Sequence, residues 1–168
     1  CVNGSYSYNC NVTIEGNTTT GSGIIYLTNA TVKVNTSSVI GSSSKANKSA
    51  NGGAIYVNSG TLEVGASTFT NNEATNGGAI YLKSGTVSIN SSSAKFASNK
   101  ATATSTTNGG GAIFIAGGTL TLTSGSIETN TARNGAGVYV SAGTFTMSRE
   151  SHSAESVPKK YSASCLRW

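Results

Sequence analysis

The sequence predicts an all-β protein folded as a right-handed parallel β-helix of about five coils. Three observations predict this fold. A short sequence motif recurs along the chain, apolar and polar residues alternate within short runs, and apolar residues follow the motif at regular intervals. The clearest copy runs from Asn51 to Thr75, and Asn76 opens the next copy with the same six residues, NGGAIY. A fixed period of about 20–50 residues is typical of stacked repeats.

Alignment of the copies on this motif produces three columns of apolar residues. The first two columns are nine residues apart in every copy, and insertions fall elsewhere. The columns are Ile25, Ile55, Ile80, Ile113 and Val138; Val34, Val64, Ile89, Leu122 and Met147; and Ile14, Ile40, Phe69, Phe96 and Ile127.

Each copy contains runs in which inward and outward side chains alternate, as in Thr61–Val64. Short alternating runs rich in β-branched residues and bounded by Gly, Ser and Asn predict strands rather than helices. Such a short strand becomes stable when it stacks on its equivalent about 4.8 Å away in the next coil. Right-handed coiling is expected because parallel crossovers are almost always right-handed.

The 168 residues fit one domain with three parts. Residues 1–20 are expected to form an N-terminal partial coil or cap, and residues 21–147 the repeats. Insertions are expected to loop out at Ser42–Ala50 and at Ala101–Thr107, at the corner before the next Gly pair. Residues 148–168 leave the pattern and hold the only Pro, His and Trp. This tail is either a C-terminal cap or a segment foreign to the repeat.

Composition argues against several classes of protein. Charged residues are 10%, and the net charge of +5 comes from scattered Lys and Arg without the basic, aromatic-bearing stripe of a nucleic-acid surface. No apolar run approaches the ~18 residues of a membrane span. Cys1 and Cys10 could form a disulfide, which would suit an extracellular location. Alternatively, Cys1 is the lipid-modified first residue of a bacterial lipoprotein.

The words GGAI, at Gly52, Gly77 and Gly110, and FxxN, at Phe69 and Phe96, carry a family resemblance. Together they resemble the repeats of chlamydial polymorphic membrane proteins. The resemblance implies a β-helical autotransporter passenger that is exposed at the bacterial surface and acts as an adhesin. It also implies a host-surface protein or glycan as the partner.

The residues do not predict a catalytic, metal or cofactor site. The chain has no Asp, and Glu15 and Glu128, which share a column, would lie four coils apart. That separation is about 19 Å by the strand spacing, whereas paired glycosidase carboxylates lie about 5–9.5 Å apart. His152 has no ligand cluster around it. The expected function is therefore a non-catalytic surface or secreted protein. The alternative is a section of an extracellular polysaccharide-active β-helix enzyme whose catalytic residues lie outside this chain.

Three polar or aromatic columns accompany the core. A column of Asn17, Asn72, Asn99 and Asn130 predicts a structural amide ladder. A column of outward Thr, from Thr31 to Thr144, suggests ice binding, but the adjacent Lys33 and Glu63 would break a regular array. An aromatic residue follows the first apolar column in each coil and is expected to face outward. This candidate partner surface, the aromatic column, is Tyr26, Tyr56, Tyr81, Phe114 and Tyr139. It is interpreted either as a stack that stabilises the sheet or as a contact surface, for protein or for sugar rings lying on the phenol faces.

Overall fold

The computed structural model describes residues 5–8, 11–35 and 37–148, with only the backbone described for 5–8. These residues form strands and turns and contain no helix. Every strand pairing among them is parallel, and successive coils stack as a β-solenoid of about five turns. The predicted parallel β-helix is confirmed. The tail from 149 onward and the Cys1–Cys10 pair lie outside the described residues.

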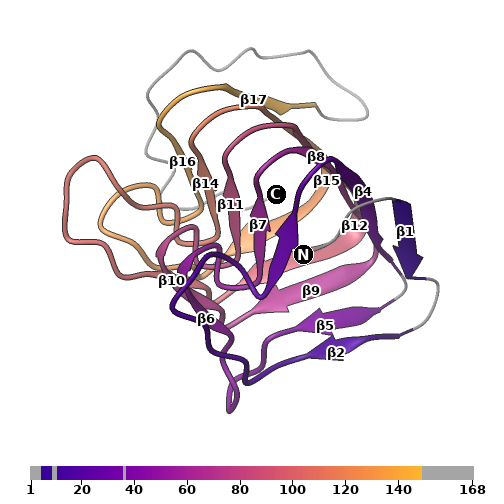
Figure 1. Ribbon diagram of the computed structural model, residues 1–168, viewed down its shortest axis with the longest axis horizontal. Coiled ribbons are helices and arrows are strands. Elements are labelled where there is room, and N and C mark those ends of the chain that lie inside the picture. Colours follow the sequence, from indigo (N-terminus) through magenta and orange to yellow (C-terminus); the bar gives the residue numbers. More distant parts are fainter. Residues whose placement is uncertain (1–4, 9–10, 36, 149–168) are drawn as a thin grey trace.

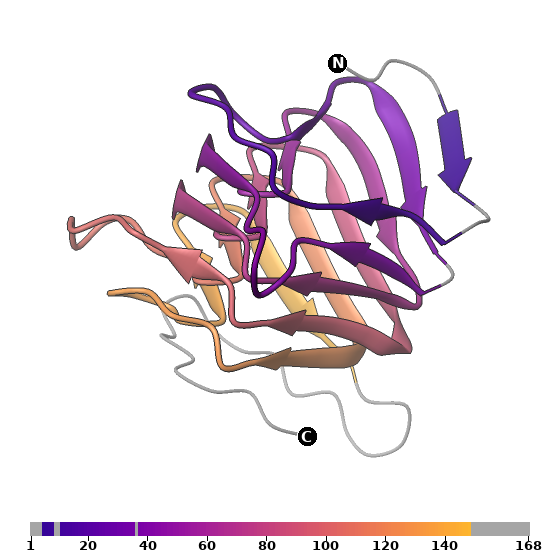
Figure 2. The same cartoon turned by 90° about the horizontal axis from the view of Figure 1, so that it is seen from below.

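The strands form three sheets that run along the solenoid (Figures 1 and 2). The five-stranded sheet contains β3 (Ile25–Leu27), β7 (Ile55–Val57), β11 (Ile80–Leu82), β14 (Ile113–Ile115) and β16 (Val138–Val140). The three-stranded sheet contains β6 (Lys48–Asn51), β10 (Glu73–Asn76) and β13 (Lys100–Ala101). The nine-stranded sheet contains β1 (Ser5–Tyr8), β2 (Thr13–Ile14), β4 (Ala30–Val34), β5 (Ser38–Ile40), β8 (Gly60–Val64), β9 (Ser67–Thr70), β12 (Thr86–Ala97), β15 (Thr119–Glu128) and β17 (Thr144–Met147).

The core contains the three predicted apolar columns in the predicted register, together with further inward columns such as Val57 with Leu82 and Leu62 with Val87. Strand pairing aligns Ile55 with Ile80, Val64 with Ile89, and Phe69 with Phe96. All six side chains are fully buried. The two phenylalanine rings stack with centroids 4.6 Å apart. Burial of apolar surface along the whole solenoid therefore selects the register, because a one-residue slip would turn each inward column to solvent.

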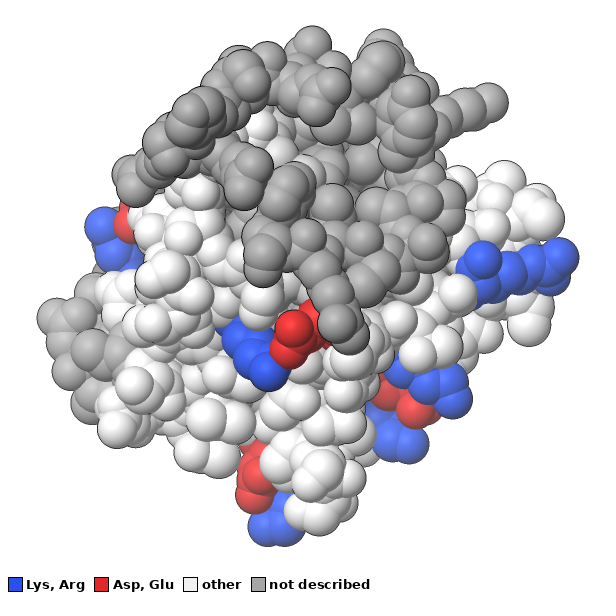
Figure 3. Space-filling model, turned by 180° about the vertical axis from the view of Figure 1, so that it is seen from behind, with Lys and Arg blue, Asp and Glu red and all other residues white. Residues whose placement is uncertain are grey.

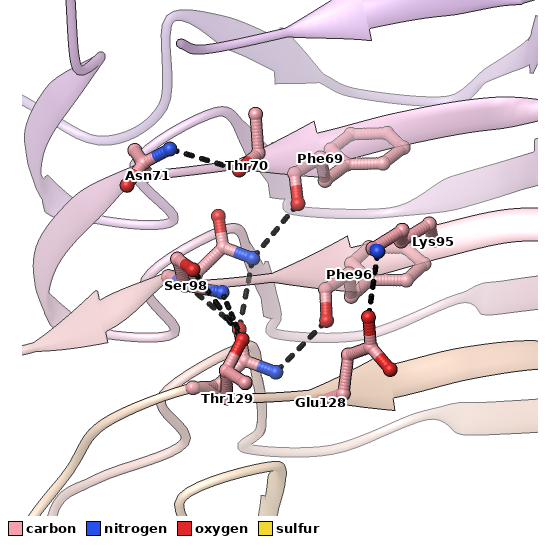
Figure 4. Close-up of polar contacts among 10 residues, drawn as sticks. Phe69, Thr70, Asn71, Lys95, Phe96, Ser98, Glu128 and Thr129 are labelled. Atoms are coloured by element: carbon pink, nitrogen blue, oxygen red, sulfur yellow. Dashed lines mark hydrogen bonds and ion pairs between the residues drawn. The ribbon is translucent and has the colours of Figure 1, made fainter. Parts of the chain in front are cut away.

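Each coil turns a corner at an asparagine, and the three inner ones, Asn47, Asn72 and Asn99, are fully buried. The side-chain amides form a continuous asparagine ladder, in which each Nδ2 donates to the Oδ1 of the next coil at 2.9–3.1 Å. Each Nδ2 from the second member onward also donates to a backbone carbonyl of the preceding coil, such as Asn99 to Phe69 and Asn130 to Phe96 (Figure 4). The ladder consists of Asn17, Asn47, Asn72, Asn99 and Asn130.

Asn47 corrects two expectations from the sequence. The asparagine column expected from the sequence lacked Asn47, because Asn47 follows Ile40 by seven residues rather than three. Ser42–Ala50 were expected to loop out, whereas Lys48–Asn51 form β6 and pair with β10. The loop therefore ends before Asn47, and the chain rejoins the solenoid at the ladder. Without an amide at this buried position, the ladder side chains of the neighbouring coils would lose hydrogen-bond partners.

Other deviations from a regular coil are smaller. Ser91–Ser93 lie inside β12, where the pairing with β15 shifts register between Asn90 and Lys95. Within residues 1–20, β1 pairs in register with Thr31–Val34. Right-handed coiling stays an inference from the general preference of parallel crossovers.

Candidate partner-binding surface

The aromatic column lies on the five-stranded sheet, one ring from each strand. Alternation along the strands turns each ring away from the core residue that precedes it, such as Ile55 before Tyr56. The ring centroids are 5.0 Å apart along the first four rings and 5.3 Å apart between Phe114 and Tyr139. The predicted stack of five rings is therefore present.

The rings are less exposed than the sequence suggested. The four tyrosines are half-buried, and Phe114 is only 4% exposed. The glycine turns that precede the strands lie close to the base of these side chains. A Cβ placed on Gly23 would lie 2.6 Å from the backbone nitrogen of Tyr56 and 2.7 Å from its Cβ. Glycine at this position lets the backbone approach the aromatic column this closely.

The stacking decides which part of each ring a partner can reach. Neighbouring rings are nearly parallel, with interplanar angles of 3–8° for the first four rings. Each inner ring therefore turns both faces to its neighbours and presents its edge outward. A sugar ring cannot lie on the face of Tyr56 or Tyr81, because the adjacent rings already occupy those faces. The reachable surface is a row of ring edges that end in phenol hydroxyls, interrupted by Phe114.

The hydroxyls in the middle of the row have raised pKa values. Burial raises the pKa of Tyr56, and the neighbouring phenols of Tyr81 and Tyr26 raise it further. Burial also raises the pKa of Tyr81. Like any tyrosine, both side chains are neutral at neutral pH and can donate as well as accept hydrogen bonds. The row can bind acceptor groups without adding charge to the surface.

The charged side chains form separate pairs between neighbouring coils. Figure 3 shows red carboxylates beside blue cations on a largely uncharged face. Each glutamate in the described part of the chain pairs with a lysine of an adjacent coil. The pairs are Lys33–Glu63 at 2.9 Å, Lys45–Glu15 at 3.1 Å, Lys48–Glu73 at 3.6 Å and Lys95–Glu128 at 2.6 Å.

Neighbouring groups stabilise the ionised form of one of these carboxylates, that of Glu15. The pKa of Glu15 is lowered, first by a hydrogen bond with Ser42 and then by Lys45. A carboxylate that is fully ionised and paired is a poor general acid at neutral pH. No group of three or more His, Cys, Asp or Glu that could hold a metal ion occurs among the described residues.

The outward threonines also stack in register from Thr31 to Thr144. The ion pair of Lys33 and Glu63 occupies the adjacent outward column on the first two full coils. These two charged side chains interrupt the hydroxyl array, as the sequence suggested.

The fold and its columns define a parallel β-solenoid repeat protein with a stacked aromatic column on one face. Residues 66–83, which cover β9, β10 and β11, match the family model of the Chlamydia polymorphic membrane protein repeat. This match agrees with the resemblance carried by the FxxN and GGAI words. No curated protein and no solved structure matches the chain. The described part of the chain contains no helix with the length and apolarity needed to cross a membrane.

Proposed function

We propose that the chain is a section of a non-catalytic, surface-exposed β-solenoid that acts as an adhesin-like passenger. The match to a polymorphic membrane protein repeat supports association with the outer membrane or the cell surface. The observation that carries the binding role is the continuous aromatic column, since tyrosine is favoured at interfaces and joins an apolar body to a polar tip.

The distribution of carboxylates supports a non-catalytic role. A glycosidase-type mechanism uses two carboxyl groups on either side of one sugar bond, one of them protonated. The described glutamates instead each pair with a lysine, and Glu63 and Glu73, which share a coil, lie in different sheets. None of the pairs brings two carboxylates together.

The geometry of the column favours a protein as the partner. Carbohydrate sites that use aromatic residues place a sugar on a free ring face, and the inner rings have no free face. A protein surface can instead accept hydrogen bonds from the phenol hydroxyls and pack against the apolar ring edges. Such contacts would be spread over several coils.

The test replaces Tyr56 and Tyr81 together with threonine, which keeps strand propensity. The double variant removes three stacked pairs, each worth about 0.2–1 kcal/mol. It should therefore melt at a lower temperature than the wild type but remain folded, as circular dichroism can verify. Retention of protein-coated beads on cultured host cells should fall sharply.

Two controls separate the column from general damage. Lys33→Thr with Glu63→Thr alters another face without changing the net charge, and it should leave retention unchanged. Tyr56→Phe with Tyr81→Phe keeps the rings and removes the hydroxyls, so a loss of retention would assign binding to the phenol edges. Wild-type retention by a folded threonine double variant would overturn the proposed role of the column.

A further inference from the structure

Two loops project side by side from one corner of the solenoid, as Figures 1 and 2 both show. They contain residues 102–107 and 131–134 and are named the loop corner here. Arg133 donates through Nη1 to the carbonyl of Thr104, and Asn134 donates through Nδ2 to the carbonyl of Ser105 at 3.1 Å and to that of Asn108 at 2.8 Å. The two loops therefore hold each other in place, and the corner is a preformed surface.

The loop corner combines hydroxyls with unpaired cations. Thr102, Thr104, Ser105, Thr106 and Thr107 are all exposed. Within the described part of the chain, the cations without an ion pair are Lys83, Lys100 and Arg133. Two of these three lie at or beside this corner: Lys100 is the bridge partner of Thr131, which precedes Arg133 by two residues.

A column of charged residues on neighbouring coils adds positive charge beside the loop corner. Lys48, Glu73 and Lys100 follow one another in register across three coils, so two lysines flank a single glutamate. The loop corner and this neighbouring column together carry three cations, Lys48, Lys100 and Arg133, and one carboxylate, Glu73, which pairs with Lys48. Because the chain is only 10% charged and its other described glutamates are paired elsewhere, little nearby negative charge opposes this excess.

We propose that the loop corner binds an acidic polysaccharide. The guanidinium of Arg133 suits a planar carboxylate or a sulfate, Lys100 adds a point charge, and the loop hydroxyls suit the hydroxyls of sugar rings. The exposed hydroxyls of the 102–107 loop can exchange hydrogen bonds with the many hydroxyls of a sugar chain, which favours a polysaccharide over an acidic peptide. The site is separate from the aromatic column, so either proposal can fail without the other.

The experiment measures binding of heparin and of hyaluronan to the whole chain by biolayer interferometry at low and physiological salt. The wild type should bind at least one of the two, more weakly as salt screens the charges. Lys100→Gln with Arg133→Gln should weaken binding at least about tenfold. The matched control, Lys45→Gln with Lys83→Gln, removes the same charge elsewhere and should change affinity much less.

Three results would overturn the proposal. One is no binding of either polysaccharide at low salt. Another is an equal loss in the two double variants, which would mean that net charge alone attracts the polymer. The third is equally tight, Arg133-dependent binding of poly-glutamate, which would identify an acidic peptide as the ligand. If the glutamine double variant unfolds, Arg133→Lys replaces it. That variant keeps the charge but loses the planar fork, and it should still bind measurably more weakly than the wild type.

Discussion

Asn72 offers a direct test of whether the asparagine ladder holds the coils together. Its side chain is fully buried and makes three hydrogen bonds. Nδ2 donates to the Ile40 carbonyl and to Asn99 Oδ1, both at 2.9 Å, and Oδ1 accepts from Asn47 Nδ2 at 3.0 Å. Asn72→Leu keeps the number and branching of the side-chain heavy atoms, so it removes these bonds while keeping a side chain of similar shape in the same place.

The expected cost follows from the groups that the substitution leaves unpaired. The Ile40 carbonyl loses its donor from Asn72, and one N–H of Asn47 loses its acceptor. The Oδ1 of Asn99 still accepts from the backbone nitrogen of residue 72. Each buried group left without a partner costs about 1–3 kcal/mol. The variant should therefore lose about 2–6 kcal/mol, a large share of the ~5–15 kcal/mol of a typical domain.

The matched control is Asn17→Leu at the exposed end of the same ladder. Asn17 also donates to the next ladder residue, at 3.1 Å, but water can replace its partners. The control should cost less than about 1 kcal/mol. Urea unfolding followed by circular dichroism measures both values. Equal and small losses in the two variants would refute the claim that buried amides stabilise the corner.

Three further predictions concern the core, the turns and the aromatic column. Val64→Asp should abolish cooperative unfolding in a thermal melt, because an unpaired buried charge costs several kcal/mol; a normal melt would contradict the register. Gly78→Ala should destabilise by at least about 1–3 kcal/mol in urea, since its Cβ would lie 2.2 Å from a carbonyl of the next coil, whereas Gly21→Ala has ordinary space and should be nearly neutral. The raised pKa values of Tyr56 and Tyr81 favour the neutral phenols in the folded state, so their contribution to stability is complete below about pH 10 and is lost as pH rises through the folded pKa values. Urea midpoints measured across that range should fall less steeply for Tyr56→Phe with Tyr81→Phe, and identical slopes would contradict the shift.

The sequence was sufficient to predict the architecture because the same side chain returns at the same place in every coil. Ile55 and Ile80, or Val64 and Ile89, are in the core for one physical reason, and five repetitions make the pattern readable. The ladder was readable for the same reason, except at Asn47. Comparison of NKSANGGAIY with NEATNGGAIY would have found it, since both segments place Asn four residues before the repeated motif.

The candidate site was harder to predict than the fold. Alternation along the strand places Tyr56 and Tyr81 on the outer face. It does not predict the orientation of the rings or how closely the glycine turns approach these side chains. Those features depend on the spacing between coils and on backbone contacts such as that of Gly23. The bonds that join the loop corner, from Arg133 and Asn134, cross 26–29 residues of chain and have no sequence signature.

The most direct test of the account is an NMR measurement of contacts between neighbouring coils. The central claim is that parallel strands stack in register and place the aromatic rings in one column. The account predicts nuclear Overhauser effects that join Tyr56 to Tyr81 and Tyr81 to Phe114, through both ring and backbone protons. Strong contacts between Hα protons of paired strands, which mark antiparallel pairing, or the absence of ring contacts between Tyr56 and Tyr81, would contradict it.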